Sequence, residues 1–293
     1  MFVNTWHEIT RSIISTTGHA FRIEHRASVG GGCINSAFRI GGGGATYFVK
    51  INSADKANMF AAEAAGLAEI ARSNTVRVPR PICHGGNSAG SWLVLEYIAF
   101  GSRGDARALG RDLAAMHRVS SETFGWHRDN TIGATPQINT QRNDWPTFWR
   151  EHRLGFQLRL AAQNGFGSRL QKSGEQLLEK IPAFFTRYRP QPSLLHGDLW
   201  SGNIGFDEAG RPLIFDPAVY YGDREADLAM TELFGGFSGD FYAAYREALP
   251  LYAGYAVRKH LYNLYHVLNH LNLFGGGYLA QAERMIEELL AEV

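Results

Sequence analysis

The chain has 293 residues, of which 45% are hydrophobic, enough apolar material for one or two packed cores, and this excludes an intrinsically disordered protein. The 29 Lys and Arg nearly balance the 28 Asp and Glu, so the formal charge is +1 and a nucleic-acid partner is disfavoured. Two cysteines are too few for a disulfide framework, and the sequence shows neither a signal peptide nor an apolar run of about 18 residues. We therefore expect a cytoplasmic protein that makes no contact with a membrane.

The first third of the chain is predicted to form strands around one helix. β-branched and aromatic residues separated by glycine clusters indicate the strands, and apolar residues at helical spacing indicate the helix. The predicted strands are residues 21–29, 36–40, 46–51, 82–84 and 92–98, and the predicted helix is residues 58–73. The run of four glycines at 41–44 is predicted to be a hairpin loop, which makes the sheet antiparallel.

The rest of the chain is mostly helical in pattern. The predicted helices are residues 105–118, 145–163, 169–188, 241–249, 258–273 and 278–292, and one buried strand is predicted at 213–215. The fold class is therefore α+β, with a small sheet-rich N-terminal lobe over residues 1–97 and a larger helical C-terminal lobe over residues 98–293. A cleft between two such lobes is the usual place for a ligand.

The strongest candidate for chemistry is the run from His196 to Asn203. It holds Asp198 and, five positions later, Asn203, while Asp216 follows the predicted buried strand. Phosphoryl transfer needs a carboxylate that orients and deprotonates a hydroxyl, together with oxygen ligands for Mg²⁺. Asp198, Asn203 and Asp216 could supply these groups.

Two upstream features fit the same chemistry. Lys50 ends a predicted strand, and a carboxylate on the following helix could fix it; Glu63 is the first choice and Glu69 the alternative. A glycine run between two predicted strands could bring backbone N–H groups close to phosphates. That run consists of Gly30, Gly31 and Gly32.

With these residues identified, the chain resembles the fructosamine kinase family, also called ketosamine kinases, within the wider group with an aminoglycoside-phosphotransferase-like and protein-kinase-like fold. The lysine, glutamate, aspartate and asparagine set above indicates the wider fold. The narrower resemblance lies in several motifs spread over nearly the whole chain, namely residues 30–34, 136–139, 143–148, 196–203, 216–218, 221–222, 234–237 and 262–265.

The resemblance implies ATP-dependent phosphorylation of a sugar hydroxyl on a glycated amine, small or protein-bound, which is a protein-deglycation repair activity. It implies a two-lobed fold in which Asp198 is the proton acceptor, Asn203 and Asp216 bind Mg²⁺, and Lys50 binds the ATP phosphates. The adenine would be held by backbone groups of the segment Leu95, Glu96 and Tyr97, and the rings of Trp145 and Trp200 would line the sugar side.

Where protein kinases carry Asp-Phe-Gly, this chain has Asp216, Pro217 and Ala218, and no Ala-Pro-Glu follows. A small molecule or an adduct is therefore favoured over ordinary protein hydroxyls. The sequence leaves open a different alcohol acceptor, such as an aminoglycoside or a choline-like alcohol, and a catalytically silent nucleotide-binding protein. It also leaves open the choice between fructose and ribulose adducts, and the oligomeric state.

Two further features carry hypotheses. Cys33 lies in the glycine run, where nearby N–H groups could lower the pKa of its thiol, so a redox-sensitive cysteine is one interpretation and a small apolar loop residue is the other. The acidic stretch at residues 223–227 is interpreted as the N-terminus of a helix, where carboxylates interact favourably with the helix dipole.

Overall fold

The computed structural model describes residues 3–30 and 34–293. The chain divides into two compact units. The first comprises Met1–Asp105 together with Gly205–Pro217, and the second comprises Ala106–Ile204 together with Ala218–Val293. The sequence-based boundary at residue 97 thus precedes Asp105, and the segment Gly205–Pro217, which the sequence analysis assigns to the helical lobe, packs with the first unit.

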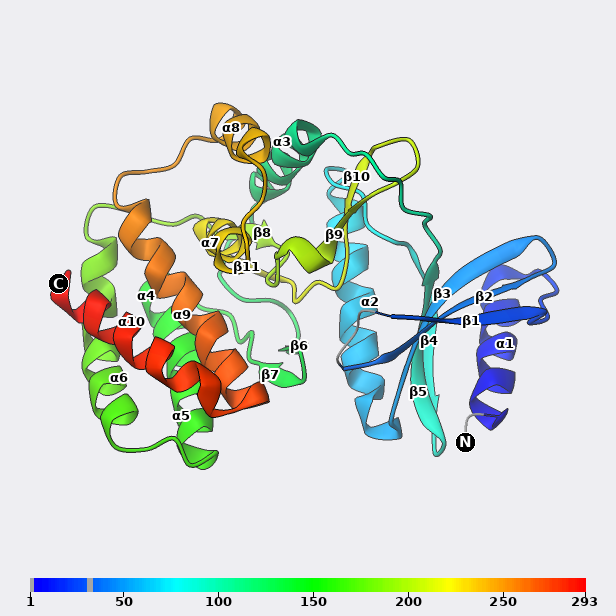
Figure 1. Cartoon of the computed structure of the whole chain (residues 1–293), viewed down its shortest axis with the longest axis horizontal. Coiled ribbons are helices and arrows are strands. Elements are labelled where there is room, and N and C mark those ends of the chain that lie inside the picture. The colour runs from blue at the N-terminus through cyan, green and yellow to red at the C-terminus, as the bar shows by residue number, and fades with distance from the viewer. Residues whose placement is uncertain (1–2, 31–33) are drawn as a thin grey trace. The chain divides into compact units, whose positions relative to one another are not determined.

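The first unit is built on a five-stranded antiparallel sheet with the strand order β1-β2-β3-β5-β4 (Figure 1). Its strands are β1 (His25–Val29), β2 (Ser36–Gly42), β3 (Ala45–Asn52), β4 (Pro81–Asn87) and β5 (Gly90–Glu96), and its helices are α1 (Val3–Thr17) and α2 (Ala57–Arg72). The predicted helix and all five predicted strands are confirmed, with ends shifted by a few residues.

The two helices lie on opposite faces of this sheet (Figure 1). Ile9 and Ile13 of α1 belong to the same apolar core cluster as Val49 and Val94 of the sheet. Because successive side chains of a strand point to opposite faces, the residue after Val49 faces away from α1. That residue is Lys50, and it lies on the side of α2.

The segment that joins the first unit late in the chain forms a small hairpin of β9 (Ile204–Phe206) and β10 (Pro212–Ile214). The N–H of Gly101 donates to the carbonyl of Phe206, and the N–H of Ile214 donates to the carbonyl of Arg77. These backbone hydrogen bonds attach the hairpin to the part of the first unit on either side of β4 and β5.

The second unit is mainly helical, as predicted. Its helices are α3 (Ala106–His117), α4 (Trp145–Trp149), α5 (Gly155–Gln163), α6 (Arg169–Lys180), α7 (Glu225–Leu233), α8 (Gly239–Ala248), α9 (Tyr255–Phe274) and α10 (Leu279–Ala291), and its short strands are β6 (Asn130–Ile132), β7 (Thr135–Gln137), β8 (Ser193–Leu195) and β11 (Tyr220–Gly222). Strand β8 pairs with β11, and β6 pairs with β7, in each case antiparallel.

The structure differs from the predicted elements in three places. Helix α1 was not predicted at all, and the continuous helix predicted at 145–163 is interrupted by a π-helical turn at Arg150–Leu154, where the N–H of Gly155 reaches back to the carbonyl of Arg150. The helix predicted at 169–188 ends at Lys180 and continues as a 3-10 helix over Ile181–Phe185, in which a proline occupies the first turn.

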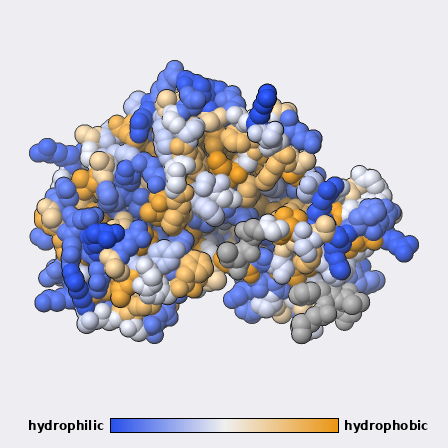
Figure 2. Space-filling view, in the orientation of Figure 1, coloured by the Kyte–Doolittle hydropathy of each residue, from blue (hydrophilic) through white to orange (hydrophobic). Residues whose placement is uncertain are grey.

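Figure 2 shows polar and apolar residues interspersed over the visible face. The exposed large apolar side chains are spread along the chain, at Ile14, Val29, Ile34, Phe100, Trp200, Tyr252, Phe274 and Val293. In the described part of the chain, no helix combines the length and the apolar character needed to cross a bilayer.

Candidate active site

A buried cluster of three charged groups lies within the first unit. The ammonium of Lys50 lies 2.7 Å from Oε1 of Glu63, on α2, and 2.5 Å from Oδ1 of Asp216, which follows β10. The Lys50 side chain is only 7% exposed, whereas that of Asp216 is 44% exposed. The alternative partner, Glu69, instead pairs with Arg72 on its own helix.

The electrostatics of this cluster favour a charged lysine. Burial would lower the pKa of Lys50, but the negative charges of Asp216 and Glu63 outweigh burial and raise it. Burial raises the pKa of Glu63, and the charge of Lys50 opposes that rise. A lysine held in place by a buried carboxylate can direct its charge to a further anion.

Asp216 has an unusual backbone conformation. Its φ is +57°, in the left-handed region that residues other than glycine adopt at a cost of about 1–2 kcal/mol. Such strain concentrates at functional sites, where the surrounding structure holds it in place. Here the backbone of β10 and the ion pair with Lys50 hold it, and the exposed part of the carboxylate remains available to a ligand.

In the second unit, the run from His196 to Asn203 forms a loop after β8. Gly197 has a φ of +82°, and a Cβ at this position would lie 2.1 Å from the carbonyl oxygen of Ala218. Only glycine fits, since both the backbone conformation and the close approach exclude a side chain. The N–H of Ala218 in turn donates to the carbonyl of His196 at 2.8 Å, so the two segments are held together through their backbones.

A buried carboxylate on α7, that of Asp227, holds this loop through hydrogen bonds to its backbone. Oδ2 of Asp227 accepts from the N–H of His196 at 2.7 Å, and Oδ1 accepts from the N–H of Gly197 at 2.8 Å. Oδ2 also lies 3.2 Å from Nε2 of His117, whose Nδ1 lies 2.8 Å from the hydroxyl of Tyr245. Asp227 therefore determines the position of the backbone immediately before Asp198.

Within the loop, Asn203 is buried and contacts Asp198. Its Nδ2 donates to the carbonyl oxygen of Asp198 at 2.8 Å and lies 3.3 Å from the carboxylate oxygen Oδ2. The asparagine thus holds both the backbone and the side chain of the aspartate. The N–H of Asp198 donates to Nδ1 of His196 at 3.2 Å.

The comparisons agree with this geometry. Residues 5–292 match the family model described as fructosamine kinase. The chain belongs to the fructosamine kinase family. It is 50% identical to a probable ketoamine kinase of Synechocystis over 97% of each chain, and 46% identical to a chloroplastic protein-ribulosamine 3-kinase of Oryza sativa over 96% of this chain and 83% of that protein. A solved structure assigned as a fructosamine-3-kinase of Haemophilus somnus superposes with a TM-score of 0.90 at 29% identity, covering 97% of both chains.

Membership of the fructosamine kinase family confirms the resemblance, the kinase-like fold and the prediction of a phosphotransferase of this type. The candidate residues fall into two sets. Lys50, Glu63 and Asp216 meet in the first unit, and Asp198 and Asn203 meet in the second.

The glycine run is only partly described. Gly30 is exposed at the end of β1, with nothing within 4 Å of a Cβ built on it, whereas Gly31, Gly32 and Cys33 lie outside the described residues. The hypotheses of phosphate binding by those glycines and of a redox-sensitive Cys33 stay predictions. Burial raises the pKa of the Cys83 thiol to about 11, which makes this cysteine a weak nucleophile at neutral pH.

The segment predicted to bind adenine lies at the end of β5, which pairs with β3 and β4. Leu95 is buried, and Tyr97 lies against the guanidinium of Arg39. The N–H of Glu96 donates to the carbonyl of Arg80 at 2.8 Å, so this part of the backbone is tied to the segment before β4. Contact with adenine stays a prediction.

The two tryptophans predicted on the sugar side differ. Trp200 is 38% exposed, two residues after Asp198, and its ring makes an edge contact with Phe234. Trp145 is 1% exposed in the core of the second unit, where its Nε1 donates to the hydroxyl of Tyr262 at 3.1 Å. A ring so enclosed has no face to offer a ligand, so the structure gives Trp145 a packing role.

Two supports of the site were not predicted. The acidic stretch does form the N-terminus of a helix, α7, as expected, but its carboxylates are also buried and individually paired, Asp227 among them. The motif at 136–139 has a similar role, since Nε2 of Gln137 donates to the carbonyl of Ala218 at 3.0 Å and to Oδ1 of Asn130 at 2.8 Å. These polar side chains are recognised as supports by their burial, and burial cannot be read from the sequence alone.

Magnesium binding by Asn203 and Asp216, which belong to different units, stays a prediction. No cluster of three or more His, Cys, Asp and Glu suited to a metal exists among the described residues, so the protein alone offers no complete cage. Mg²⁺ characteristically takes only one or two protein oxygens and completes its shell with phosphate and water. The exposed carboxylate of Asp216 and the amide oxygen of Asn203 are oxygens of that kind.

Proposed function

We propose that this protein is an ATP-dependent kinase of ketosamines, which transfers the γ-phosphoryl group of ATP to a sugar hydroxyl of a glycated amine. The observation that carries the proposal is the buried Lys50, shared by Glu63 and a left-handed Asp216, in a chain of the fructosamine kinase family. The named activities of the Synechocystis and Oryza relatives support the ketosamine as acceptor.

In this reaction the acceptor hydroxyl oxygen forms a bond to the γ-phosphorus as the bond to the β,γ-bridging oxygen breaks. ADP leaves with that oxygen, and the hydroxyl proton passes to the carboxylate of Asp198. Asn203 holds Asp198 in orientation, as its two contacts support, and Lys50 neutralises charge on the ATP phosphates. Orientation and charge neutralisation supply most of the rate in such a transfer.

Asn203 and Asp216 would hold Mg²⁺ in this proposal. When bound, the ion neutralises the phosphate oxygens and fixes their geometry. Because Oδ1 of Asp216 is engaged by Lys50, the other carboxylate oxygen is the one proposed to meet the ion.

The test is ADP release by the purified protein with MgATP, measured against fructose-derived and ribulose-derived amines, aminoglycosides and choline. Asp198→Asn is the control, since it keeps the shape of the side chain and removes the proton acceptor. We expect turnover on ketosamines only, lost by a factor of about 10³ or more in the variant, while MgATP binding survives. The ratio of kcat/KM values then identifies the preferred sugar.

Turnover on aminoglycosides or choline but on no ketosamine would replace the proposed acceptor and keep the kinase. MgATP binding without ADP release on any acceptor would favour the silent nucleotide-binding protein. Equal turnover in wild type and Asp198→Asn would remove Asp198 from the proposed mechanism.

A further inference from the structure

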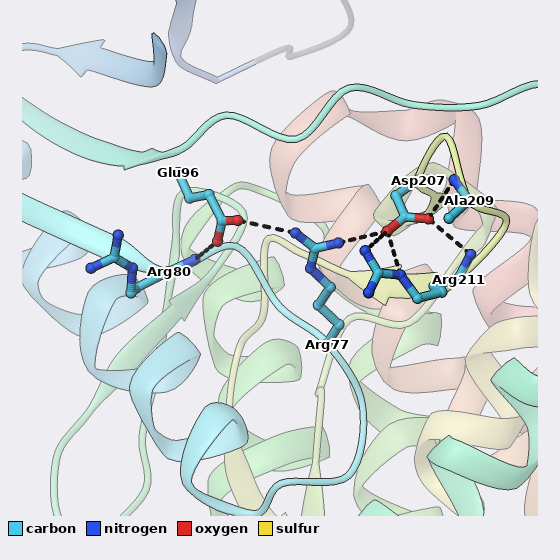
Figure 3. A network of polar contacts seen from close by, with 6 residues as sticks. All are labelled: Arg77, Arg80, Glu96, Asp207, Ala209 and Arg211. Carbon is cyan, nitrogen blue, oxygen red and sulfur yellow. Dashed lines mark hydrogen bonds and ion pairs between the residues drawn. The ribbon is translucent and has the colours of Figure 1, made fainter. Parts of the chain in front are cut away.

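One arginine joins three separate segments of the first unit (Figure 3). Arg77 lies between α2 and β4, and its Nη1 donates to Oδ2 of Asp207 at 2.7 Å while its Nη2 donates to Oε1 of Glu96 at 3.0 Å. Its backbone carbonyl accepts from the N–H of Ile214 at 3.0 Å. The residue contacts these segments through different atoms, so all the contacts exist together.

The end of β5 and strand β10, both contacted by Arg77, adjoin residues of the proposed nucleotide site. Glu96 ends β5, in the segment predicted to hold adenine, and Ile214 lies two residues before Asp216. The second oxygen of Glu96, Oε2, accepts from the N–H of Arg80 at 3.3 Å. The carboxylate of Glu96 is therefore turned toward the segment before β4 and held from two directions.

Asp207 anchors the opposite end of the network. Its Oδ1 accepts from the backbone N–H groups of Ala209 and Arg211, both at 3.0 Å, which closes the turn between β9 and β10. These contacts and the guanidinium of Arg211 lower the pKa of Asp207, so it stays ionised at neutral pH. The side chain of Asp207 is 7% exposed and that of Arg211 is 70% exposed. The backbone donors of the turn contact Oδ1 of Asp207, and Arg77 adds a contact to Oδ2.

We propose that Arg77 is a positioning residue for nucleotide binding: it fixes the adenine segment at Glu96 relative to β10, the strand that leads to Asp216. This inference rests on the proposed function. A planar guanidinium can donate to two carboxylates in a fixed relative geometry, whereas a lysine ammonium is a single point of charge on a flexible stem. Without Arg77, two carboxylates lose the cation that they share, and the two segments lose their side-chain link.

The experiment measures the dissociation constant of MgAMPPNP for the full chain by isothermal titration calorimetry, with no acceptor present. Arg77→Ala is expected to bind about tenfold more weakly, since the arrangement competent to bind becomes a minor population. Arg77→Lys is expected to fall between this variant and wild type. Steady-state kinetics with a ketosamine should show the loss in the KM for ATP, with the KM for the acceptor unchanged.

Arg211→Ala is the matched control, because it removes an arginine from the same carboxylate, Asp207, without touching Glu96. It should bind the nucleotide within about twofold of wild type. Glu96→Gln provides a second comparison: in that background, Arg77→Ala should cost much less affinity than in wild type, because the link is already weakened. Thermal unfolding of each variant ensures that titrations are made on folded protein.

Wild-type affinity in folded Arg77→Ala would overturn the inference, as would an equal loss in Arg211→Ala. If Arg77→Ala does not fold, the Arg77→Lys variant is the test, because it keeps the positive charge but cannot donate to Glu96 and Asp207 in the same fixed geometry. Wild-type affinity of Arg77→Lys for MgAMPPNP would then overturn the inference. Failure of the wild-type protein to bind MgAMPPNP would overturn the proposed function itself.

Discussion

Replacing Asp227 with asparagine tests whether the loop before Asp198 is held from α7. The change keeps the shape of the side chain but removes its charge and leaves one oxygen where two accept hydrogen bonds. Asp227 is 1% exposed, and its oxygens accept from the N–H groups of His196 and Gly197 at 2.7 and 2.8 Å. At least one of these buried donors then faces an NH₂ group.

The magnitude follows from those contacts. A hydrogen bond to a charged group contributes about 1.5–3 kcal/mol, and a buried donor left unpaired costs about 1–3 kcal/mol. We therefore expect Asp227→Asn to lower the free energy of unfolding by about 2–4 kcal/mol. Because Gly197 directly precedes Asp198, we also expect kcat to fall by about 10²-fold through misplacement of the proton acceptor.

The pKa of Asp227 determines how the stability of the protein depends on pH. Burial alone would raise the pKa of Asp227, but the hydrogen bond and charge of His117, the charge of His196 and the N–H of Gly197 outweigh burial and lower it. A carboxylate whose pKa is lowered by folding stabilises the protein above its unfolded pKa of about 3.9, and that contribution is lost as the pH falls through the folded pKa. The stability difference between wild type and Asp227→Asn should be full at pH 7 and shrink below about pH 4.

The assay is urea denaturation, followed by tryptophan fluorescence, at pH 7 and at a pH below about 4. The value of kcat is measured at pH 7. Asp240→Asn serves as the matched control, because the Asp240 side chain is 74% exposed and pairs only loosely with Arg107 at 3.8 Å. It should change stability by less than about 0.5 kcal/mol. An Asp227→Asn variant with wild-type midpoint and kcat would refute the anchoring of the loop.

Three further predictions concern single side chains. Lys50→Met should lower kcat/KM for ATP by about 10²-fold or more, and calorimetry should show weaker MgATP binding, since two carboxylates then face the phosphates without their cation. Gly197→Ala should abolish turnover and lower the thermal midpoint, because its Cβ would lie 2.1 Å from a carbonyl oxygen; a fully active, equally stable variant would contradict the geometry. Trp200→Ala should raise the KM for the acceptor by about tenfold and leave the KM for ATP unchanged, whereas an unchanged acceptor KM would remove this ring from the sugar side.

Sequence patterns predicted those features that depend on local periodicity. The alternation of β3 is enough to place Lys50 on the face opposite Val49, and the strand ending before Asp216 is visible as a short apolar run. The three-residue strands β6, β7, β8, β9 and β11 were not predicted, because a segment that short shows no period.

Other features depend on tertiary contacts that no local pattern contains. The sequence indicated only a helix-dipole role for Asp227, because its backbone partners, His196 and Gly197, lie in the loop after β8, 31 and 30 residues away in sequence. Arg77 and Asp207 are 130 positions apart, and nothing near either residue indicates the pairing. Helix α1 was not predicted, although Trp6, Ile9 and Ile13 have helical spacing.

The late return of Gly205–Pro217 to the first unit has a consequence during biosynthesis. As the chain leaves the ribosome, the five-stranded sheet can pair once residue 96 has emerged, but Asp207 and Asp216 are still about a hundred residues from synthesis. Until then the nascent sheet exposes Lys50 and Arg77 without these carboxylate partners. The first unit is thus completed only after residues 106–204 of the second unit have been translated, so its folding cannot finish before that part of the second unit has been made.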